Sequence, residues 1–311
     1  MSKPLIYIDQ NVIGLQLQGS ICLSSRNDLV WVYSKEHFAE IRRADNPETY
    51  LNVLEEIDAK LLELVLDESF RITDKAVLNE RDSPHHNYSL YIETTKEVKF
   101  DETIFDPFQV WVNGGDDGGL LKDLPDKLVR EIAQLTSGLS FETSDAAEKV
   151  LNIKPEFDSL ITDIISNGND INKTRAALGD IKGTIGSISG DKEIMRIWEI
   201  ISPTMSTNDI TCDQFFGFDP VDKQSYLVWP MYLGIVGCNA VLDILGFQAE
   251  KKCRKLNKIH NVRSDASHMA MAAFCSAVIS EDKRFIRRAS AIYNYKNIDT
   301  ISILMEKSTN E

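Results

Sequence analysis

Two acidic residues closely follow short apolar runs, which is where an α/β sheet places its functional groups. The run LIYI at 5–8 ends at Asp9, and the run AVIS at 277–280 is followed after one residue by Asp282. Both runs are typical of buried parallel strands. Because ligands in open α/β sheets bind outside the carboxyl ends of the strands, we expect these two carboxylates at one edge of the sheet.

Two further acids lie in helices predicted nearby. Ser34 is a suitable N-cap after the apolar run 29–33, and Glu40 lies inside the helix that it opens. Ser264 is a suitable N-cap for a second helix, which places Asp265 in the first turn of that helix. We therefore expect the four acidic side chains to converge.

Such a cluster requires compensating positive charge, because neighbouring carboxylates disfavour one another's ionised form. Mg²⁺ and Mn²⁺ prefer oxygen ligands and retain water molecules that can attack a phosphate. One or two such ions can position the water and stabilise the leaving oxygen of a phosphodiester. The pattern predicts a site for Mg²⁺ or Mn²⁺ with a nuclease activity, formed by four acids: Asp9, Glu40, Asp265 and Asp282.

Each acid taken alone also has a structural explanation. Asp9 can cap a turn, and Asp265 in a first turn is favoured by the helix dipole. Glu40 can be a surface helix residue, and Asp282 can be a solvated loop residue. Only their joint placement relative to the predicted strands and helices favours the functional interpretation.

The net charge of −14 argues at first against a nucleic-acid partner, because phosphate contacts come from Lys and Arg. The distribution of charge changes this conclusion, since residues 251–288 hold ten basic and three acidic residues. A solvated basic helix face is the simpler explanation of the segment taken alone. Four of its basic residues follow the predicted site and are expected to contact the backbone of a nucleic-acid substrate: Lys283, Arg284, Arg287 and Arg288.

Two histidines lie near the acids in sequence. His37 precedes Glu40 by three residues, and His268 follows Asp265 by three residues on the same predicted helix face. Either ring can position a phosphate or a water molecule. A hydrogen-bonded structural histidine is the favoured interpretation of both.

Strands and helices alternate at both ends of the chain, while the middle is mainly helical. This pattern predicts one α/β domain split by an insertion. We assign 1–79 and 250–311 to the α/β domain and 80–249 to a mostly helical insertion. The other predicted elements are a final strand at 298–304, a long helix at 48–67, and helices near 126–136, 154–165, 191–201 and 226–249.

Two features bear on the compartment. Five scattered cysteines with no C-x-x-C pair, and no secretory signal at the start, predict a cytoplasmic protein with reduced thiols. The apolar stretch 226–249 is interrupted by Pro230, Asn239 and Asp243. We therefore expect a buried core helix there and no membrane association.

Four segments, in this order along the chain, resemble the PIN-like nuclease superfamily, whose members include toxin ribonucleases and RNA-processing nucleases. They are IYIDQNVI (5–12), YSKEHFAEI (33–41), SDASHMAMAA (264–273) and VISEDKRFIRRA (278–289). The resemblance covers roughly 1–75 and 250–305 and implies a PIN-like parallel sheet flanked by helices. It also implies that the four acids bind the metal, with Asn11 and Ser280 as supporting polar groups. The region 80–250 is far longer than the compact family core.

The resemblance implies an endonuclease that prefers RNA to DNA, because most of the superfamily acts on RNA. By analogy alone it also suggests a toxin or phage-defence effector with an inhibitory or activating protein partner, and it leaves oligomerisation open. One alternative is a catalytically inactive scaffold, which the intact acids disfavour. Another is a haloacid-dehalogenase-like phosphohydrolase, which needs a second Asp where this chain has Asn11.

Overall fold

The computed structural model describes most of the 311-residue chain. The described residues are 3–97, 106–115, 118–136, 143–167, 173, 176, 181–204, 209–223, 226–249 and 256–306. Part of the predicted basic segment lies outside them, namely Lys251, Lys252, Arg254 and Lys255, as do the side chains of Lys258 and Arg263.

The chain forms two compact units. The first comprises Met1–Tyr91, Asp180–Ala249 and Ser264–Glu311, and the second comprises Ile92–Gly179 and Glu250–Arg263. All residues predicted to form the site belong to the first unit. The domain limits at 79/80 and 249/250 stay a prediction.

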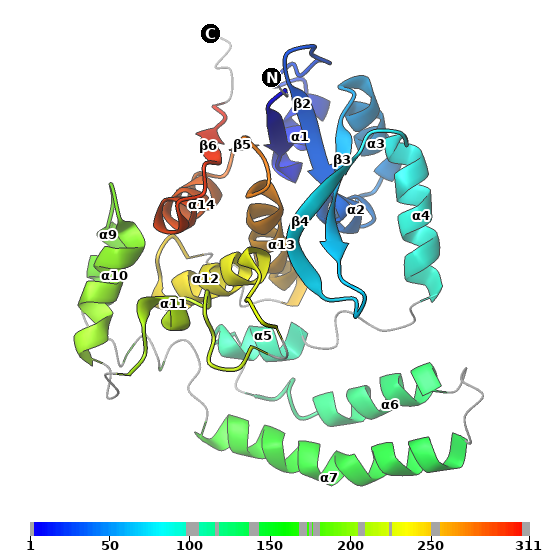
Figure 1. Cartoon of the computed structure of the whole chain (residues 1–311). Helices are drawn as coiled ribbons and strands as arrows, with labels where there is room; N and C mark the ends of the chain where they lie inside the picture. The colour runs from blue at the N-terminus through cyan, green and yellow to red at the C-terminus, as the bar shows by residue number, and fades with distance from the viewer. Residues whose placement is uncertain are drawn as a thin grey trace. The chain divides into compact units, whose positions relative to one another are not determined.

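The first unit is built on one six-stranded sheet with the order β4-β3-β2-β1-β5-β6 (Figure 1). All neighbouring strands are parallel except β3 and β4, which are antiparallel. The prediction of an α/β fold with a mostly parallel sheet flanked by helices is thus confirmed. The strands are β1 (Leu5–Ile8), β2 (Val30–Ser34), β3 (Lys60–Leu66), β4 (Ile72–Asn79), β5 (Ala277–Ser280) and β6 (Ile301–Leu304).

The helix predicted at 48–67 is wrong in its second half. Helix α3 (Pro47–Glu56) ends before Asp58, whose φ of 54° lies in the left-handed region. Lys60–Leu66 forms β3, which pairs with β2 on one side and β4 on the other. Leu61 and Leu62, which fit the spacing of a helix, are here buried in a sheet, because long-range strand pairing outweighs local helix propensity.

The predicted start of the helix carrying Asp265 is also wrong. Helix α13 (Leu256–Ala272) begins eight residues before Ser264, so Asp265 lies in its interior and not in its first turn. The segment 256–263 contains no Gly or Pro that would stop a helix, so Ser264 has no reason to act as an N-cap.

Helices on the sheet unit connect the strands and support their ends. They are α1 (Gln10–Leu17), α2 (Lys35–Ile41), α9 (Ile181–Ser187), α10 (Glu193–Ile201), the 3₁₀ turn η1 (Ser202–Thr204), α11 (Cys212–Phe215), α12 (Met231–Leu245) and α14 (Lys283–Lys296). Helix α4 (Pro84–Glu97) follows β4. The middle of the chain is therefore helical, as predicted.

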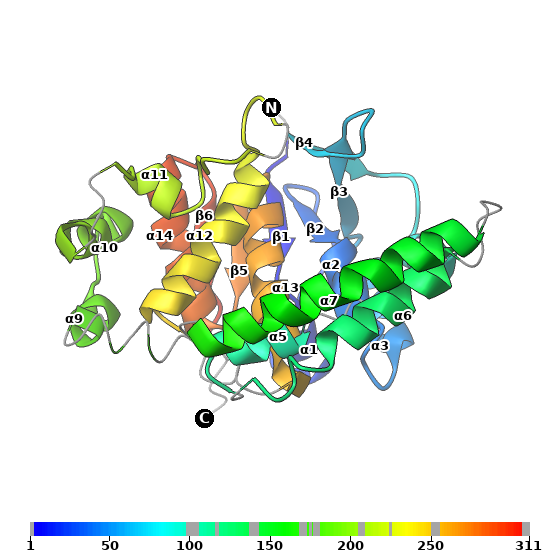
Figure 2. The same cartoon turned by 90° about the horizontal axis from the view of Figure 1, so that it is seen from below.

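The second unit contains α5 (Asp106–Val112), α6 (Leu124–Thr136) and α7 (Thr143–Asn167). Helices α6 and α7 run side by side (Figures 1 and 2). A small apolar cluster that includes Trp111, Leu121 and Ile161 holds the unit together. Among the described residues of the whole chain, no helix has both the length and the hydropathy to cross a membrane.

The order of the strands places a topological switch point between β1 and β5. From β1 the chain passes through α1 to β2 on one side, and from β5 it passes through α14 to β6 on the other. The carboxyl ends of two such strands form the crevice in which open α/β sheets bind ligands. Asp9 and Asp282 follow these two strands.

Candidate functional site

Asp9 is anchored at the switch point by Ser280. Its backbone N–H donates to the carbonyl oxygen of Ile279 at 3.0 Å, which extends the β1–β5 pairing by one residue. Its Oδ2 accepts a hydrogen bond from Ser280 Oγ at 2.6 Å. Asn11 donates to the same Oγ at 3.2 Å and accepts from the Glu281 N–H at 3.2 Å. The structure therefore places both predicted supporting residues beside Asp9.

Asp282 is fixed by its position at the start of α14. Its N–H donates to Ser280 Oγ at 3.0 Å. Its Oδ1 accepts from the backbone N–H groups of Arg284 at 2.7 Å and Phe285 at 3.3 Å, as an N-cap side chain does. Ser280 therefore links the ends of β1 and β5 and holds the two aspartates on the same edge of the sheet.

Asp265, on α13, joins these two aspartates through electrostatics. Burial raises the pKa of its carboxyl to about 8, and the charges of Asp9 and Asp282 add to the rise. The positive charges of Arg288 and His268 oppose it but do not outweigh it. The pKa of Asp9 is also raised, first by burial. Three carboxylates from different elements therefore crowd one region that holds too little positive charge to keep Asp265 ionised.

Glu40 belongs to a different pair. It accepts a hydrogen bond from Ser264 Oγ, and its Oε1 lies 3.6 Å from His268 Nε2. Burial alone would raise the pKa of Glu40, but the nearby charge of His268, with the hydrogen bond from Ser264, outweighs it and lowers the pKa to about 2. Burial would likewise lower the pKa of His268, but Glu40 outweighs it and raises the pKa to about 9. At neutral pH the two form a carboxylate–imidazolium pair.

A tyrosine that the sequence did not single out completes this pair. Tyr7 is fully buried in β1, and its hydroxyl lies 2.7 Å from His268 Nδ1 and 2.6 Å from Ser34 Oγ. Because His268 is protonated, its Nδ1–H donates to Tyr7, which in turn donates to Ser34. A continuous chain of hydrogen bonds and charge therefore joins β1, β2, α13 and α2.

His37 lies against His268 but in the opposite protonation state. The Ser34 N–H donates to its Nδ1 at 3.1 Å, so its Nε2–H donates to the Ile8 carbonyl oxygen at 2.6 Å. Burial, with the charge of His268, lowers the pKa of His37 to about 3. The two rings meet edge to face with centroids 4.6 Å apart. Both ring nitrogens of His37 are used by the backbone, and the ring ties the end of β1 to the turn before α2.

Arg288 lies inside the protein, facing carboxylates. Its side chain is 1% exposed, with Nη2 3.4 Å from Asp265 Oδ2 and Nη1 3.8 Å from Asp243 Oδ1. Asp243, on the apolar helix α12, is also buried. In the sequence, Asp243 stands out only as an interruption of an apolar stretch.

The other three predicted backbone-binding residues lie nearer the surface. Lys283 is exposed. Arg284 Nε lies 3.9 Å from Asp282 Oδ1, and Arg287 donates to the carbonyl oxygen of Ile188 at 3.0 Å. Of this set, Lys283 and Arg284 adjoin the carboxylates and are accessible to a ligand.

The donor types fit a hard divalent cation. Asp9, Asp265 and Asp282 offer carboxylate oxygens, which Mg²⁺ and Mn²⁺ prefer, and their mutual repulsion is relieved by added positive charge. In the part of the chain that the structure describes, no three His, Cys, Asp or Glu side chains already converge in metal-holding geometry. The chain matches no family model, no curated protein and no solved structure.

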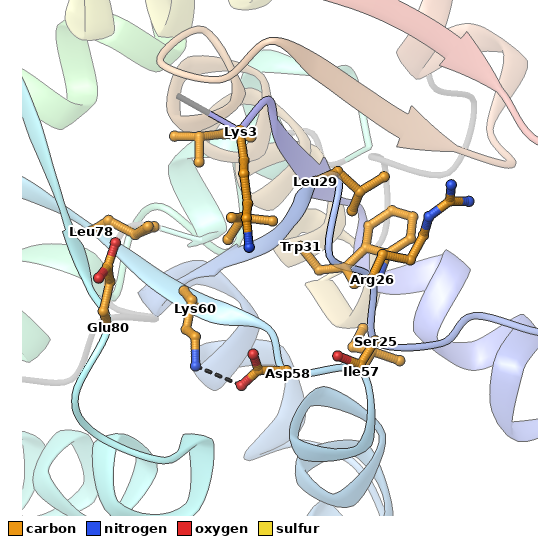
Figure 3. Close-up of a pocket in the computed structure, with 12 residues that line it drawn as sticks. Lys3, Ser25, Arg26, Leu29, Trp31, Ile57, Asp58, Lys60, Leu78 and Glu80 are labelled. Carbon is orange, nitrogen blue, oxygen red and sulfur yellow. Dashed lines mark hydrogen bonds and ion pairs between the residues drawn. The ribbon is translucent and has the colours of Figure 1, made fainter. Parts of the chain in front are cut away.

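A separate pocket of about 490 Å³ lies at the opposite, amino-terminal ends of the parallel strands (Figure 3). Its lining includes Lys3, Trp31 and Lys60, with Lys60 paired to Asp58 at 2.6 Å. It contains none of the predicted site residues. The interacting carboxyls of Asp9, Asp265 and Asp282 lie at the other end of the strands, away from this pocket.

Proposed function

We propose that this protein is a metal-dependent endonuclease of the PIN-like type that hydrolyses phosphodiester bonds with Mg²⁺ or Mn²⁺. The observation that carries the proposal is the crowding of Asp9, Asp265 and Asp282 at the switch point, where burial, with the charges of Asp9 and Asp282, raises the pKa of Asp265 to about 8. Strongly perturbed pKa values cluster at functional sites. The four resembling sequence segments add independent support.

Within this proposal, Asp9, Asp265 and Asp282 hold the cation. A divalent ion bound there supplies the positive charge that activates water and stabilises the leaving oxygen. Ser280 orients Asp9, and the start of α14 orients Asp282. Glu40, held by His268 and Ser264, acts on the site through its charge.

The substrate in this proposal is RNA in preference to DNA, in line with most of the superfamily that the sequence resembles. Lys283 and Arg284, at the accessible start of α14 beside Asp282, are suited to contact the phosphate backbone. A role as a toxin or phage-defence effector with a regulatory protein partner rests on family analogy alone.

The test is cleavage of three labelled polymers: mixed-sequence RNA, single-stranded DNA and double-stranded DNA. Each is incubated with Mg²⁺, Mn²⁺ or EDTA and with the native protein, Asp9→Asn or Asp282→Asn. We expect metal-dependent cleavage that both substitutions abolish. The matched control is Asp28→Asn, which removes an exposed carboxylate paired with Arg26 and should leave cleavage unchanged.

Two outcomes would contradict the proposal. Cleavage that persists in Asp9→Asn would move the chemistry away from the switch point. Absence of cleavage, together with no Mn²⁺ binding by the native protein, would favour the inactive scaffold. One observation favours that alternative, namely that His268 and Ser264 already engage Glu40.

A further inference from the structure

Arg288 is a buried cation that makes only long contacts with its two neighbouring carboxylates, Asp265 and Asp243. Its distances to Asp265 (3.4 Å) and Asp243 (3.8 Å) exceed the 2.7–2.9 Å of strong charge-assisted hydrogen bonds. Within the described part of the chain, its Nε and Nη1 atoms have no hydrogen-bond partner although both are inaccessible to solvent. A buried charge left so incompletely bonded is costly, and native proteins rarely retain one without a role.

Asp243 is equally unusual in its setting. It is the only charged residue of α12, whose sequence MYLGIVGCNAVLDIL is otherwise apolar or uncharged, and it is 4% exposed. Burying a carboxylate on such a helix is costly unless a positive charge lies beside it. Arg288, across the packed α12–α14 contact, supplies that charge.

Asp243 and Asp265 lie beside different nitrogen atoms of the Arg288 guanidinium group. Nη1 faces Asp243 and Nη2 faces Asp265, so a small rotation of the Arg288 side chain strengthens one pair at the expense of the other. Asp265 is also the acid that interacts with the two other carboxylates proposed to hold the cation, Asp9 and Asp282. Arg288 therefore competes directly with any cation for Asp265.

We propose that Asp243 and Arg288 form an exchangeable counter-charge for the metal site. Arg288 donates a hydrogen bond to Asp265 before a divalent ion binds, and it moves onto Asp243 when the ion engages Asp265. Asp243 is then a positioning residue and not a ligand, because it provides the place to which the arginine withdraws. This inference rests on the proposed function, since it describes how the same site accepts its cation.

The test is Mn²⁺ binding, measured by isothermal titration calorimetry on the full chain. In Asp243→Asn, Arg288 keeps only Asp265 as a charged partner, so we expect Mn²⁺ affinity to fall about tenfold, a typical coupling for contacting charges. In Arg288→Met the competing cation is absent, and we expect Mn²⁺ affinity to rise. The double variant Asp243→Asn/Arg288→Met should bind Mn²⁺ more tightly than Asp243→Asn.

The matched control is Asp213→Asn, which breaks a second ion pair of α14, with Lys296 at 3.1 Å, and should leave Mn²⁺ affinity unchanged. If Asp243→Asn does not fold, the double variant removes both buried charges together, and its comparison with the native protein and Arg288→Met still tests the exchange. The inference then requires both variants that lack Arg288 to bind Mn²⁺ at least as tightly as the native protein.

The outcomes separate this inference from the proposed function. Native protein that binds Mn²⁺, with equal affinity in Asp243→Asn and Arg288→Met, would overturn the counter-charge and leave the nuclease proposal standing. Native protein that binds no Mn²⁺ would overturn both. Opposite changes in the two single variants would establish the exchange even if no polymer were cleaved.

Discussion

Replacement of Asp265 by asparagine should change how the stability of the protein depends on pH. The folded carboxyl has a pKa of about 8, against a usual value of 3.8. The folded state therefore binds a proton that the unfolded state releases, and stability must fall as pH rises toward and through 8. Asp265→Asn removes the titrating group and with it this component of the pH dependence.

The magnitude follows from the proton balance. At pH 7 a group with a pKa of about 8 is roughly 90% protonated in the folded state and almost unprotonated when unfolded, which gives a slope of about −1.2 kcal/mol per pH unit. Integrated from pH 6 to pH 9, the loss is about 3 kcal/mol. Because 27% of the Asp265 side chain is exposed, solvent screening should reduce it to about 2 kcal/mol.

The measurement is urea unfolding followed by circular dichroism at pH 6, 7, 8 and 9, in EDTA, for the native protein and Asp265→Asn. His268, with its pKa raised to about 9, adds a slope of the same sign in both proteins, so the difference between them isolates Asp265. Asp28→Asn serves as an exposed control and should follow the native protein. Parallel curves for the native protein and Asp265→Asn would refute the argument from crowded carboxylates.

Three further substitutions test individual contacts. Ser280→Ala leaves a buried oxygen of Asp9 unbonded and should cost about 1–3 kcal/mol in urea unfolding; a loss below about 0.5 kcal/mol would contradict the bridging role. Asp282→Asn keeps the cap of α14 but should abolish the stabilisation by Mn²⁺ in thermal melts. Asp282→Ala also removes the cap and should lower the free energy of unfolding without metal by about 1 kcal/mol. Equal losses of unfolding free energy in the two variants without metal would mean that the charge of Asp282, and not its capping, matters. Tyr7→Phe removes the acceptor of the His268 Nδ1–H and should lower the His268 pKa below about 9 in an NMR titration. An unchanged His268 titration midpoint would show that Tyr7 does not accept this hydrogen bond.

The parts of the fold that local patterns specify were predicted correctly. Short apolar runs bounded by polar residues gave β1, β2, β5 and β6, and the helix predicted near 191–201 is α10. The hairpin of β3 and β4 was missed, because leucines spaced by three and four residues at 51–66 match a helix. What decides this segment is its pairing with β2 and the left-handed turn at Asp58, and neither is visible in a local pattern.

The candidate site also contains residues that the sequence could predict and residues that it could not. Asp9, Asn11, Ser280 and Asp282 lie at strand ends, so sequence position alone was enough to gather them, and the structure brings them together. The burial of Arg288 depends on how α12 packs against α14, which sequence periodicity does not report. The sequence did offer one indication that Asp243 needs a buried partner, because Asp243 is a single carboxylate in an otherwise apolar helix.

The pairing of β1 with β5 has a consequence for synthesis of the chain. Asp9 and Ser280 are separated by 271 positions, yet one hydrogen bond joins them. During translation β1 is made long before its neighbour β5. Until then β1 lacks one strand partner and Asp9 lacks the hydroxyl that orients it. A growing chain therefore carries Asp9, Glu40 and Asp265 before the site is assembled, and the site can first form only after β5 and Asp282 have been made.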